Sequence, residues 1–357
     1  MEVKASLKYE KINRIGQGQG ANSEVFLIKD SQLDGTLVAK EIDKDELLSS
    51  SQDYFEEAKK IFASRHPNVV PIKYACETEN TITLVMPYFS KGSLADFIQE
   101  NPLSLNEVIR LAQEVLNGLY HIHSKGFLHL DIKPSNIFFT DTNKPMIADF
   151  GQSRILGRNG IVEKPIMYIY TIPPEAIPDN GEAGTATISS DIYLMGATLY
   201  RAINSDPVFN AQKFPLDTDR NVIEQKIKNG EIPNRDKFMP HVPQKIRKII
   251  KKALHVNPAK RHQSAIELAD ALANVELPID WHTQIFDNGE ITWQANRGSY
   301  KPKLIVELKK DTNNLWNVIV YTDNKGIPIK KRNYCCNGVT YIQAKQHLEE
   351  KVFPNLS

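Results

Sequence analysis

Apolar and polar positions change their spacing near residue 277, which divides the chain into a longer first part and a shorter second part. The first part opens with short apolar runs, such as 36–39 and 81–86, that predict strands. Apolar residues then recur at helical spacing behind a capping-box signal, Ser104 to Glu107, so we predict a long helix that ends at Gly126. Further helices are predicted at 221–229, 243–255 and 264–275, the last with a second capping box from Ser264 to Glu267.

The second part, 278–357, alternates in the manner of strands. Its clearest signal is a hairpin turn at 287–290 between the apolar segments 284–286 and 291–293. Two more alternating segments and a helix follow, at 303–308, 316–321 and about 340–352. We predict a small α+β module of about four strands and one helix, with its tryptophans, Trp281, Trp293 and Trp316, in the core. We recognise no known family in this pattern.

Composition and charge exclude several classes of protein. The chain has 357 residues, enough for two domains, and its 44 Lys and Arg nearly balance its 43 Asp and Glu, so no global field favours nucleic acid or a membrane. Its first residues carry no apolar run of the signal-peptide kind, and no stretch approaches the roughly 18 apolar residues of a membrane span. The three cysteines, Cys76, Cys335 and Cys336, do not suggest a disulfide framework. We expect a soluble, cytoplasmic protein.

The stretch 129–136 brings an acid, a base and an amide close together. Asp131 can accept the proton of a hydroxyl nucleophile. Lys133 projects to the same side of an extended loop as Asp131 and can neutralise phosphate charge. Asn136 offers a hard oxygen ligand for Mg²⁺, and Asp149 offers a second one just before a glycine that permits a sharp turn.

These residues resemble two motifs of the protein kinase family. The stretch 129–136 is similar to the catalytic loop H-R-D-x-x-x-x-N, and 149–151 is the metal-binding D-F-G. The resemblance implies Asp131, Lys133 and Asn136 as catalytic residues, Asn136 and Asp149 as metal ligands, and ATP with Mg²⁺ as the nucleotide and metal. It also implies transfer of the γ-phosphoryl group to protein hydroxyls, including autophosphorylation. With a lysine at the position of Lys133, the motif resembles that of the serine/threonine class of protein kinases.

The resemblance covers about 9–276 and implies an α+β, two-lobed protein kinase fold. We expect a β-rich small lobe at 9–86, a hinge at 87–91 and a helical large lobe at 92–276, with the module at 278–357 as an accessory domain.

A glycine-rich turn extends the resemblance to the nucleotide site, and two registers fit the family loop G-x-G-x-x-G-x-V. A start at Gly18 includes Gly20 and Val25, with Ser23 in the place of the third glycine. A start at Gly16 puts Ser23 where the valine is expected. We prefer the first, because Val25 then lies fifteen residues before Lys40, a spacing that the family favours.

The resemblance assigns further residues around the nucleotide. Lys40 is expected to hold the α- and β-phosphates and to be positioned by Glu57, with Glu56 as the competing choice. The hinge is expected to offer adenine the C=O of Pro87 and the N–H and C=O of Phe89. Phe138 is expected beneath the adenine ring.

Two pairings are implied that support the fold rather than the chemistry. Glu175 ends the motif that resembles A-P-E and is expected to pair with Arg261. Asp191 is expected to accept hydrogen bonds from backbone N–H groups of the catalytic loop; otherwise it is an ordinary acid near a helix start.

Two departures from the family pattern change the expectations. Leu130 stands where the family usually has the arginine that receives an activation-loop phosphate, so we predict that activity does not depend on such a phosphate through this residue. Tyr168 stands where a threonine normally contacts the catalytic aspartate and lysine, which leaves substrate choice open.

Other functions remain open. A pseudokinase or scaffold retains the fold without the reaction, and a small-molecule phosphotransferase shares the aspartate and the asparagine. The module at 278–357 can also act as a binding module. Its basic segment 330–332 beside Tyr334 can contact nucleic acid or an acidic protein, although a solvated loop is the simpler interpretation.

Overall fold

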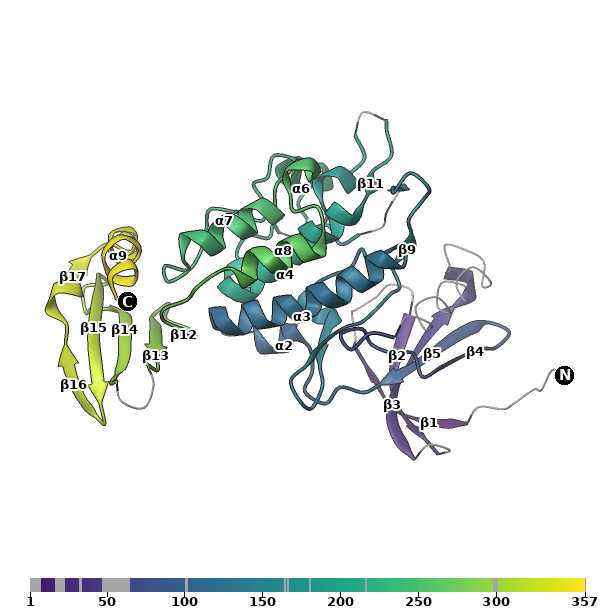
Figure 1. Ribbon diagram of the computed structural model, residues 1–357, viewed down its shortest axis with the longest axis horizontal. Coiled ribbons are helices and arrows are strands. Elements are labelled where there is room, and N and C mark those ends of the chain that lie inside the picture. The colour runs from purple at the N-terminus through teal and green to yellow at the C-terminus, as the bar shows by residue number, and fades with distance from the viewer. Residues whose placement is uncertain are drawn as a thin grey trace.

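The computed structural model places three parts in a row: a small β-lobe, a helical lobe, and the C-terminal module at the end opposite the β-lobe (Figure 1). It describes residues 8–16, 23–31, 34–46, 65–99, 102–163, 165, 167–179, 181–215, 217–297 and 301–356. Within these residues, no helix is long and apolar enough to cross a membrane.

The small lobe is a twisted antiparallel sheet with the strand order β1-β2-β3-β5-β4. Its strands are β1 Tyr9–Ile15, β2 Ser23–Asp30, β3 Gly35–Asp43, β4 Tyr74–Glu77 and β5 Thr81–Pro87. Ile28, Ala39 and Val85, from neighbouring strands, are fully buried in one apolar cluster. Because side chains alternate along a strand, burial of this face orients the residues that flank it, including Lys40 after Ala39.

The large lobe is built around two long helices, α3 Leu105–Ser124 and α4 Ile188–Asn204. The predicted capping box of α3 is confirmed: Glu107 N–H donates to Ser104 Oγ at 3.3 Å, and Ser104 N–H donates to Glu107 Oε2 at 2.9 Å. Nearly all of α4 is buried, which makes it the centre of the lobe. The shorter helices are α2 Leu94–Phe97, α5 Asp206–Asn210, α6 Arg220–Lys228, α7 Gln244–Ala253 and α8 Ala265–Ala273.

The second predicted capping box is only half right. Ser264 Oγ accepts the N–H of Glu267 at 3.1 Å, as expected. The Glu267 carboxylate, however, accepts the N–H of Gln263 at 2.7 Å rather than that of Ser264. The Glu267 side chain therefore bonds to the backbone N–H of the residue before the N-cap. The local path of the backbone decides which N–H group it meets, and residue types alone do not specify that path.

Short strand pairs bring the loops of the large lobe together. β6 Phe127–Leu128 pairs with β9 Arg154–Ile155, and β7 Ile137–Phe139 pairs with β8 Pro145–Ile147. A third pair joins β10 Val162–Glu163 to β11 Thr185–Ala186. The loop between β6 and β7 contains Asp131, and the loop between β8 and β9 contains Asp149, so these pairings place the two carboxylates on neighbouring loops.

Among the described residues, the C-terminal module has a sheet of six strands, and our expectation of about four was wrong. The strands are β12 His282–Ile285, β13 Ile291–Ala295, β14 Lys303–Lys310, β15 Trp316–Asn324, β16 Ile327–Lys330 and β17 Cys336–Val339. The two missed strands, β16 and β17, both pair with β15 at one edge of the sheet. Every residue of β16 is exposed, and its four residues include Pro328, a residue type that is rare inside strands. The predicted helix begins as α9 Tyr341–His347 and continues as a π-helical turn at Leu348–Val352.

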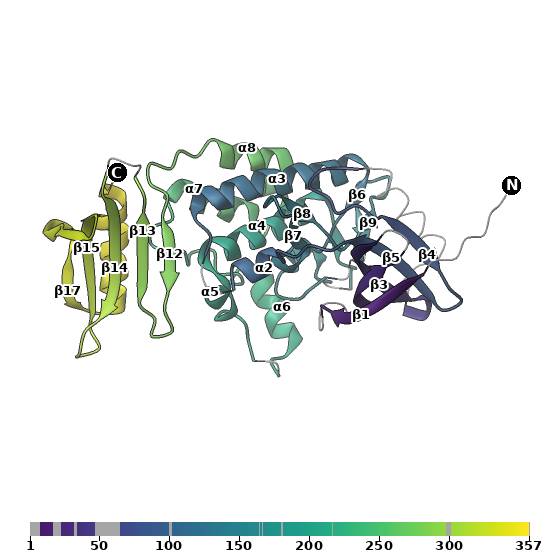
Figure 2. The same cartoon turned by 90° about the horizontal axis from the view of Figure 1, so that it is seen from below.

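The module packs on the large lobe through apolar and polar contacts, and Figure 2 shows β12 and β13 on the side that faces the helices. The three tryptophans are buried, as predicted, and belong to the same apolar cluster as α3 and α4. The indole N–H of Trp293 donates to Nδ1 of His241 in the large lobe at 3.0 Å. Arg247 of α7 forms an ion pair with Glu349 at 3.1 Å. The module and the large lobe therefore share one core.

Candidate active site

Asp131 lies at the centre of a compact polar group on the loop between β6 and β7. Lys133 Nζ donates to Asp131 Oδ2 at 2.8 Å, and Asn136 Nδ2 donates to the same oxygen at 2.8 Å. Asn136 Nδ2 also donates to the backbone C=O of Asp131 at 2.9 Å. Among the described residues, Oδ1 of Asp131 accepts no such bond, so it is the oxygen available to an incoming hydroxyl.

Asp191, at the start of α4, holds the backbone of this loop. Its Oδ2 accepts the N–H of His129 at 2.8 Å, and its Oδ1 accepts the N–H of Leu130 at 2.8 Å, which confirms the predicted contact. Oδ2 also lies 2.8 Å from Nε2 of His123 on α3. Leu130 has a φ of 63°, a conformation that costs a non-glycine residue on the order of 1–3 kcal/mol. The bonds to Asp191 compensate for this strain next to Asp131.

His129 links the catalytic loop to the segment that carries Asp149. Its ring is fully buried, and burial lowers the pKa of the imidazole, so the ring is neutral. Nδ1 accepts the N–H of Asp131 at 3.3 Å, which leaves Nε2 to donate to the C=O of Ala148 at 3.1 Å. The ring also meets Phe150 edge to face, with 5.0 Å between centroids. His129 was not among the predicted site residues, although its place at the start of the motif 129–136 was an available signal.

Lys40 and Asp149 form an ion pair across the two lobes, through Lys40 Nζ and Asp149 Oδ1. Burial raises the pKa of the Asp149 carboxyl, but the charge and hydrogen bond of Lys40 and the N–H of Gly151 outweigh it, so the net pKa is lowered. Asp149 has a φ of 62°, and Gly151 N–H donates to its Oδ1 at 3.1 Å. In the sheet, Lys40 lies opposite Val25. The expected partner Glu57 and the glycines Gly18 and Gly20 lie outside the described residues.

The described residues that were expected around adenine lie where β5 meets the large lobe. β5 ends at Pro87, and the ring of Phe89 stacks on Phe138 of β7 with 5.8 Å between centroids. The C=O of Phe89 accepts the N–H of Gly92 at 3.1 Å, which closes a turn. Two of the residues assigned to adenine, one from the hinge and one from β7, are therefore in contact.

The donor set suits magnesium better than a metal that prefers nitrogen or sulfur ligands. Asp149 offers a carboxylate, and Asn136, whose amide nitrogen binds Asp131, retains its amide oxygen. Ala148 N–H donates to the C=O of Asn136 at 2.9 Å, which ties together the two segments that carry these oxygens. Across the described ranges, no three His, Cys, Asp or Glu side chains gather to hold a metal alone. A few protein oxygens completed by phosphate oxygens and water are typical of magnesium sites.

Leu130 is 1% exposed and packs in an apolar cluster with Leu128, Val162 and Ala186. Val162 belongs to the segment 149–175, so this segment is attached to the catalytic loop through apolar contacts. Tyr168, in contrast, is 45% exposed and lies near Tyr170, with 5.8 Å between ring centroids. In the part of the chain that the structure describes, no bond joins Tyr168 to Asp131 or Lys133.

The chain is similar in sequence to a known family and to several known proteins. A family model described as "Protein kinase domain" matches residues 9–272. A probable serine/threonine-protein kinase of Dictyostelium discoideum is 32% identical over 215 residues, which cover 59% of this chain and 12% of that protein. The serine/threonine-protein kinase PrkC of Bacillus subtilis is 27% identical over 267 residues, or 73% of this chain and 39% of that protein. The DNA damage-responsive serine/threonine-protein kinase RqkA of Deinococcus radiodurans is 29% identical over 273 residues, with 73% and 39% covered. The chain thus spans at most about two fifths of the length of these relatives.

Proposed function

This chain belongs to the protein kinase family, and on that premise we propose that it transfers the γ-phosphoryl group of ATP to serine or threonine hydroxyls of proteins, its own included. The observation that carries the proposal is the position of Asp131, whose Oδ2 is held by Lys133 and Asn136 while Oδ1 remains available. An orienting carboxylate beside a cation is the arrangement that hydroxyl-to-phosphate transfer requires.

Each charged residue has a distinct task in this reaction. Asp131 orients the substrate hydroxyl and takes up its proton through Oδ1. Lys133 and Lys40 offset the negative charge of the phosphoryl groups. Asn136 and Asp149 would hold magnesium, which would supply further positive charge to the phosphates. Because Asp131, Lys133 and Asn136 sit on a loop held by Asp191 and His129, they are oriented before the substrate arrives, and such preorganisation provides most of the rate in phosphoryl transfer.

Several details are parts of the proposal. Lys133 supports the serine/threonine class. Gly18, Gly20, Val25 and Glu57 complete the nucleotide site, and the hinge atoms of Pro87 and Phe89 contact adenine above Phe138. The kinase domain spans 9–276, with ATP and Mg²⁺ as its nucleotide and metal, and the expected location is the cytoplasm.

The test is to incubate the purified chain with labelled ATP and Mg²⁺, with and without a generic protein substrate, and to map phosphorylated residues by mass spectrometry. We expect phosphate on serine or threonine with the native chain and its loss in Asp131→Asn. Asp287→Asn is the matched control, because Asp287 is an exposed residue of the β12–β13 turn. Phosphate on tyrosine alone would contradict the serine/threonine class.

The second candidate is a scaffold that binds ATP without transferring phosphate, and it is favoured by the exposed Tyr168 at a position that normally supports substrate docking. A thermal shift with Mg-ATP, together with no turnover on any protein or peptide, would support the scaffold over the kinase.

A further inference from the structure

The sheet of the C-terminal module ends in a free edge that β16 and β17 form in line with each other. Both strands pair with β15, β17 with its first residues and β16 with its last. Figure 1 shows this edge on the side of the module that faces away from the large lobe. Within the described residues, no further strand lies beside it, so its outward backbone groups are open to another chain.

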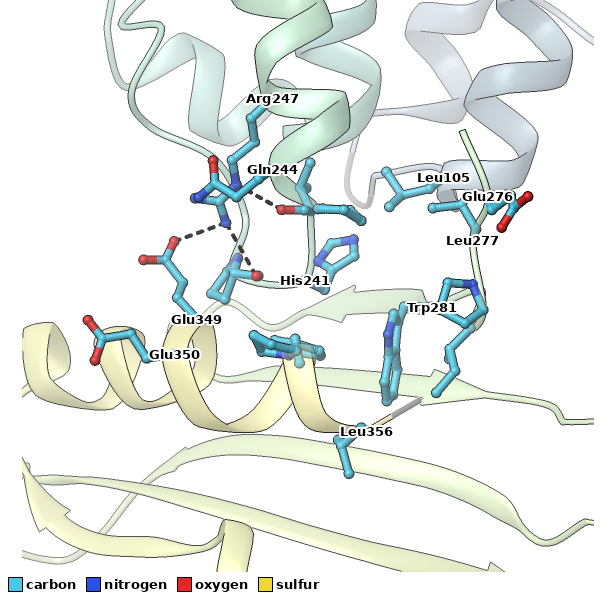
Figure 3. Close-up of a pocket in the computed structure, with 17 residues that line it drawn as sticks. Leu105, His241, Gln244, Arg247, Glu276, Leu277, Trp281, Glu349, Glu350 and Leu356 are labelled. Atoms are coloured by element: carbon cyan, nitrogen blue, oxygen red, sulfur yellow. Dashed lines mark hydrogen bonds and ion pairs between the residues drawn. The ribbon is translucent and has the colours of Figure 1, made fainter. Parts of the chain in front are cut away.

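The module is attached to the large lobe through other parts of its surface. Figure 3 shows Arg247 of α7 directed at Glu349, which follows α9, and these two side chains form an ion pair at 3.1 Å. The indole of Trp293, on β13, bonds to the large lobe as well. All four residues of β16 are exposed, so the packing of the two parts leaves this strand uncovered.

The hydrogen-bond register shows which backbone groups of β16 point outward. Lys331 N–H donates to the C=O of Val320, its opposite residue on β15, at 2.8 Å. Because bonded and non-bonded pairs alternate along an antiparallel ladder, Lys330 and Pro328 turn their backbone groups away from β15. Proline has no N–H, so the outward row consists of the C=O of Pro328 and the N–H and C=O of Lys330. Such a row can pair with the backbone of one added strand.

The two faces of β16 differ in their side chains. Ile327 and Ile329 lie on one face and are 66% and 60% exposed. Lys330 lies on the other face, because successive side chains of a strand point to opposite sides. A strand added beside β16 therefore meets apolar side chains on one face and a cation on the other. This favours a partner in which apolar and acidic residues alternate.

The region around this edge is strongly cationic, although the whole chain is nearly neutral. From 324 to 348 the chain has five Lys and Arg residues and no Asp or Glu. Three of these cations, at 330–332, follow one another at the end of β16, and no side chain in the described ranges forms an ion pair with them. This charge repels the same edge of a second copy and attracts an acidic segment.

A nucleic acid is attracted by the same charge, but the rest of the edge suits it less well. Proteins that bind single strands present exposed aromatic rings on which the bases stack. β16 has no aromatic residue, and Tyr334, which follows it, is partly buried and donates its hydroxyl to the C=O of Asn355 at 3.1 Å. The exposed isoleucines instead favour apolar side chains, which a protein segment supplies.

We propose that the edge of β16 binds an extended segment of another protein, in which acidic and apolar residues alternate, as one further strand of the sheet. The acidic side chains lie beside the basic segment 330–332, and the apolar ones lie beside the two exposed isoleucines. This inference goes beyond the proposed kinase reaction, and its test uses no measurement of phosphate transfer.

The test uses the full chain, labelled with ¹⁵N-lysine, and three fluorescent peptides of about eight residues, a usual strand length. The first alternates valine and glutamate, the second alternates valine and lysine, and the third has the composition of the first with all glutamates before all valines. Fluorescence anisotropy measures binding, and amide hydrogen exchange by NMR follows the N–H of Lys330. We expect the first peptide to bind several-fold more tightly than the other two and to slow the exchange of this N–H.

Substitutions of Lys330 separate its charge from its backbone N–H. Lys330→Glu keeps the N–H and reverses the charge, so we expect several-fold weaker binding of the glutamate peptide and tighter binding of the lysine peptide. Lys330→Pro removes the outward N–H and leaves the bonds to β15, which come from the neighbouring residues. We expect it to bind more weakly than Lys330→Gln, which loses only the charge. Lys248→Glu, at an exposed position of α7, should bind as the native chain does.

Four results would each overturn the proposal. The first is that the alternating glutamate peptide does not bind, or binds no better than its block-ordered counterpart. The second is an unchanged exchange rate of the Lys330 N–H in the complex. The third is tighter binding of a poly-dT oligonucleotide than of the peptide, which would indicate a nucleic-acid site. The fourth is a native chain that sediments as a dimer while Lys330→Pro sediments as a monomer, which would indicate a second copy at this edge.

Discussion

Glu175 and Arg261 form a two-pronged ion pair that joins the end of the segment 149–175 to the helical lobe. Arg261 Nη1 donates to Glu175 Oε1, and Nη2 donates to Oε2, both at 2.7 Å. The Arg261 side chain is fully buried and also donates through Nε to the C=O of His255 at 2.6 Å. The predicted pairing is confirmed, and its geometry is one that a lysine cannot reproduce.

We expect Arg261→Ala to lower the free energy of unfolding by about 3–5 kcal/mol, because it leaves the Glu175 carboxylate without its buried partner. Denaturant unfolding measures the effect. Arg220→Ala is the control, since Arg220 pairs with Glu224 while 71% of its own side chain is exposed, and such pairs contribute less than about 1 kcal/mol. Equal losses in the two variants would contradict this account.

Activity is expected not to require phosphorylation of the segment 149–175. Leu130 cannot bind a phosphate, and its apolar contacts with Val162 already attach the segment to the catalytic loop. The serine and threonine of this segment, Ser153 and Thr171, are 2% and 5% exposed and so are poor acceptors.

The measurement is the turnover of phosphatase-treated chain, with the unphosphorylated state verified by mass spectrometry, and we expect less than a twofold change. A loss of activity that returns when Ser153 or Thr171 is phosphorylated again would refute the prediction.

Asn136→Ala is expected to lower kcat even at saturating Mg²⁺, by roughly 10²–10⁴-fold if Asp131 loses its orientation as a general base. The reason is that Asn136 has two tasks: its amide nitrogen positions Asp131 at 2.8 Å, and its amide oxygen is the proposed metal ligand. Measuring kcat over a range of Mg²⁺ concentrations separates these two tasks. Asn106→Ala, at an exposed position of α3, should behave as the native chain. Full recovery at high Mg²⁺ would mean that only the metal contact matters.

Stability is expected to fall as the pH decreases below about 6.5. Burial lowers the pKa of His241 to about 3 and that of His262 to about 4, and it also lowers the pKa of His129, from an ordinary value of 6.5. Between these values and 6.5 the unfolded chain binds protons that the folded chain does not, so the stability present above pH 6.5 is lost toward acid.

Each such histidine changes the folding equilibrium by up to about tenfold per pH unit, as measured by denaturant unfolding from pH 7.5 to 4.5. His262→Gln removes one of the protons that the unfolded chain binds and the folded chain does not. The variant should therefore show a smaller slope of unfolding free energy against pH. A slope that is unchanged in this variant would show that His262 titrates normally in the folded state.

Much of the site could be predicted because its residues are close in sequence. Asp131, Lys133 and Asn136 lie within one short loop, so their mutual contacts follow from local backbone geometry and residue type. The contact of Asp191 with the catalytic loop and the Glu175–Arg261 pair join residues that lie far apart in the sequence. They could still be predicted, because they belong to the motifs of a recognisable fold. The second capping box was only half right, since the Glu267 carboxylate accepts the N–H of Gln263 rather than that of Ser264, and only the actual path of the chain selects between them. The strands β16 and β17 were missed because each has only four residues and includes a proline or a glycine, residue types that favour turns.

By itself, the sequence determined the kinase family and most of the helices and strands, and it named the groups that we propose to react, because local patterns and short motifs encode these. Only the tertiary structure decided the partners of groups that lie far apart along the chain. It packed Leu130 against Val162 and joined Lys40 to Asp149. It also enclosed His241 between the large lobe and the module. The physical reason is that burial and charge pairing depend on which surfaces meet, and His241 meets Trp293 only after the module has packed on the large lobe.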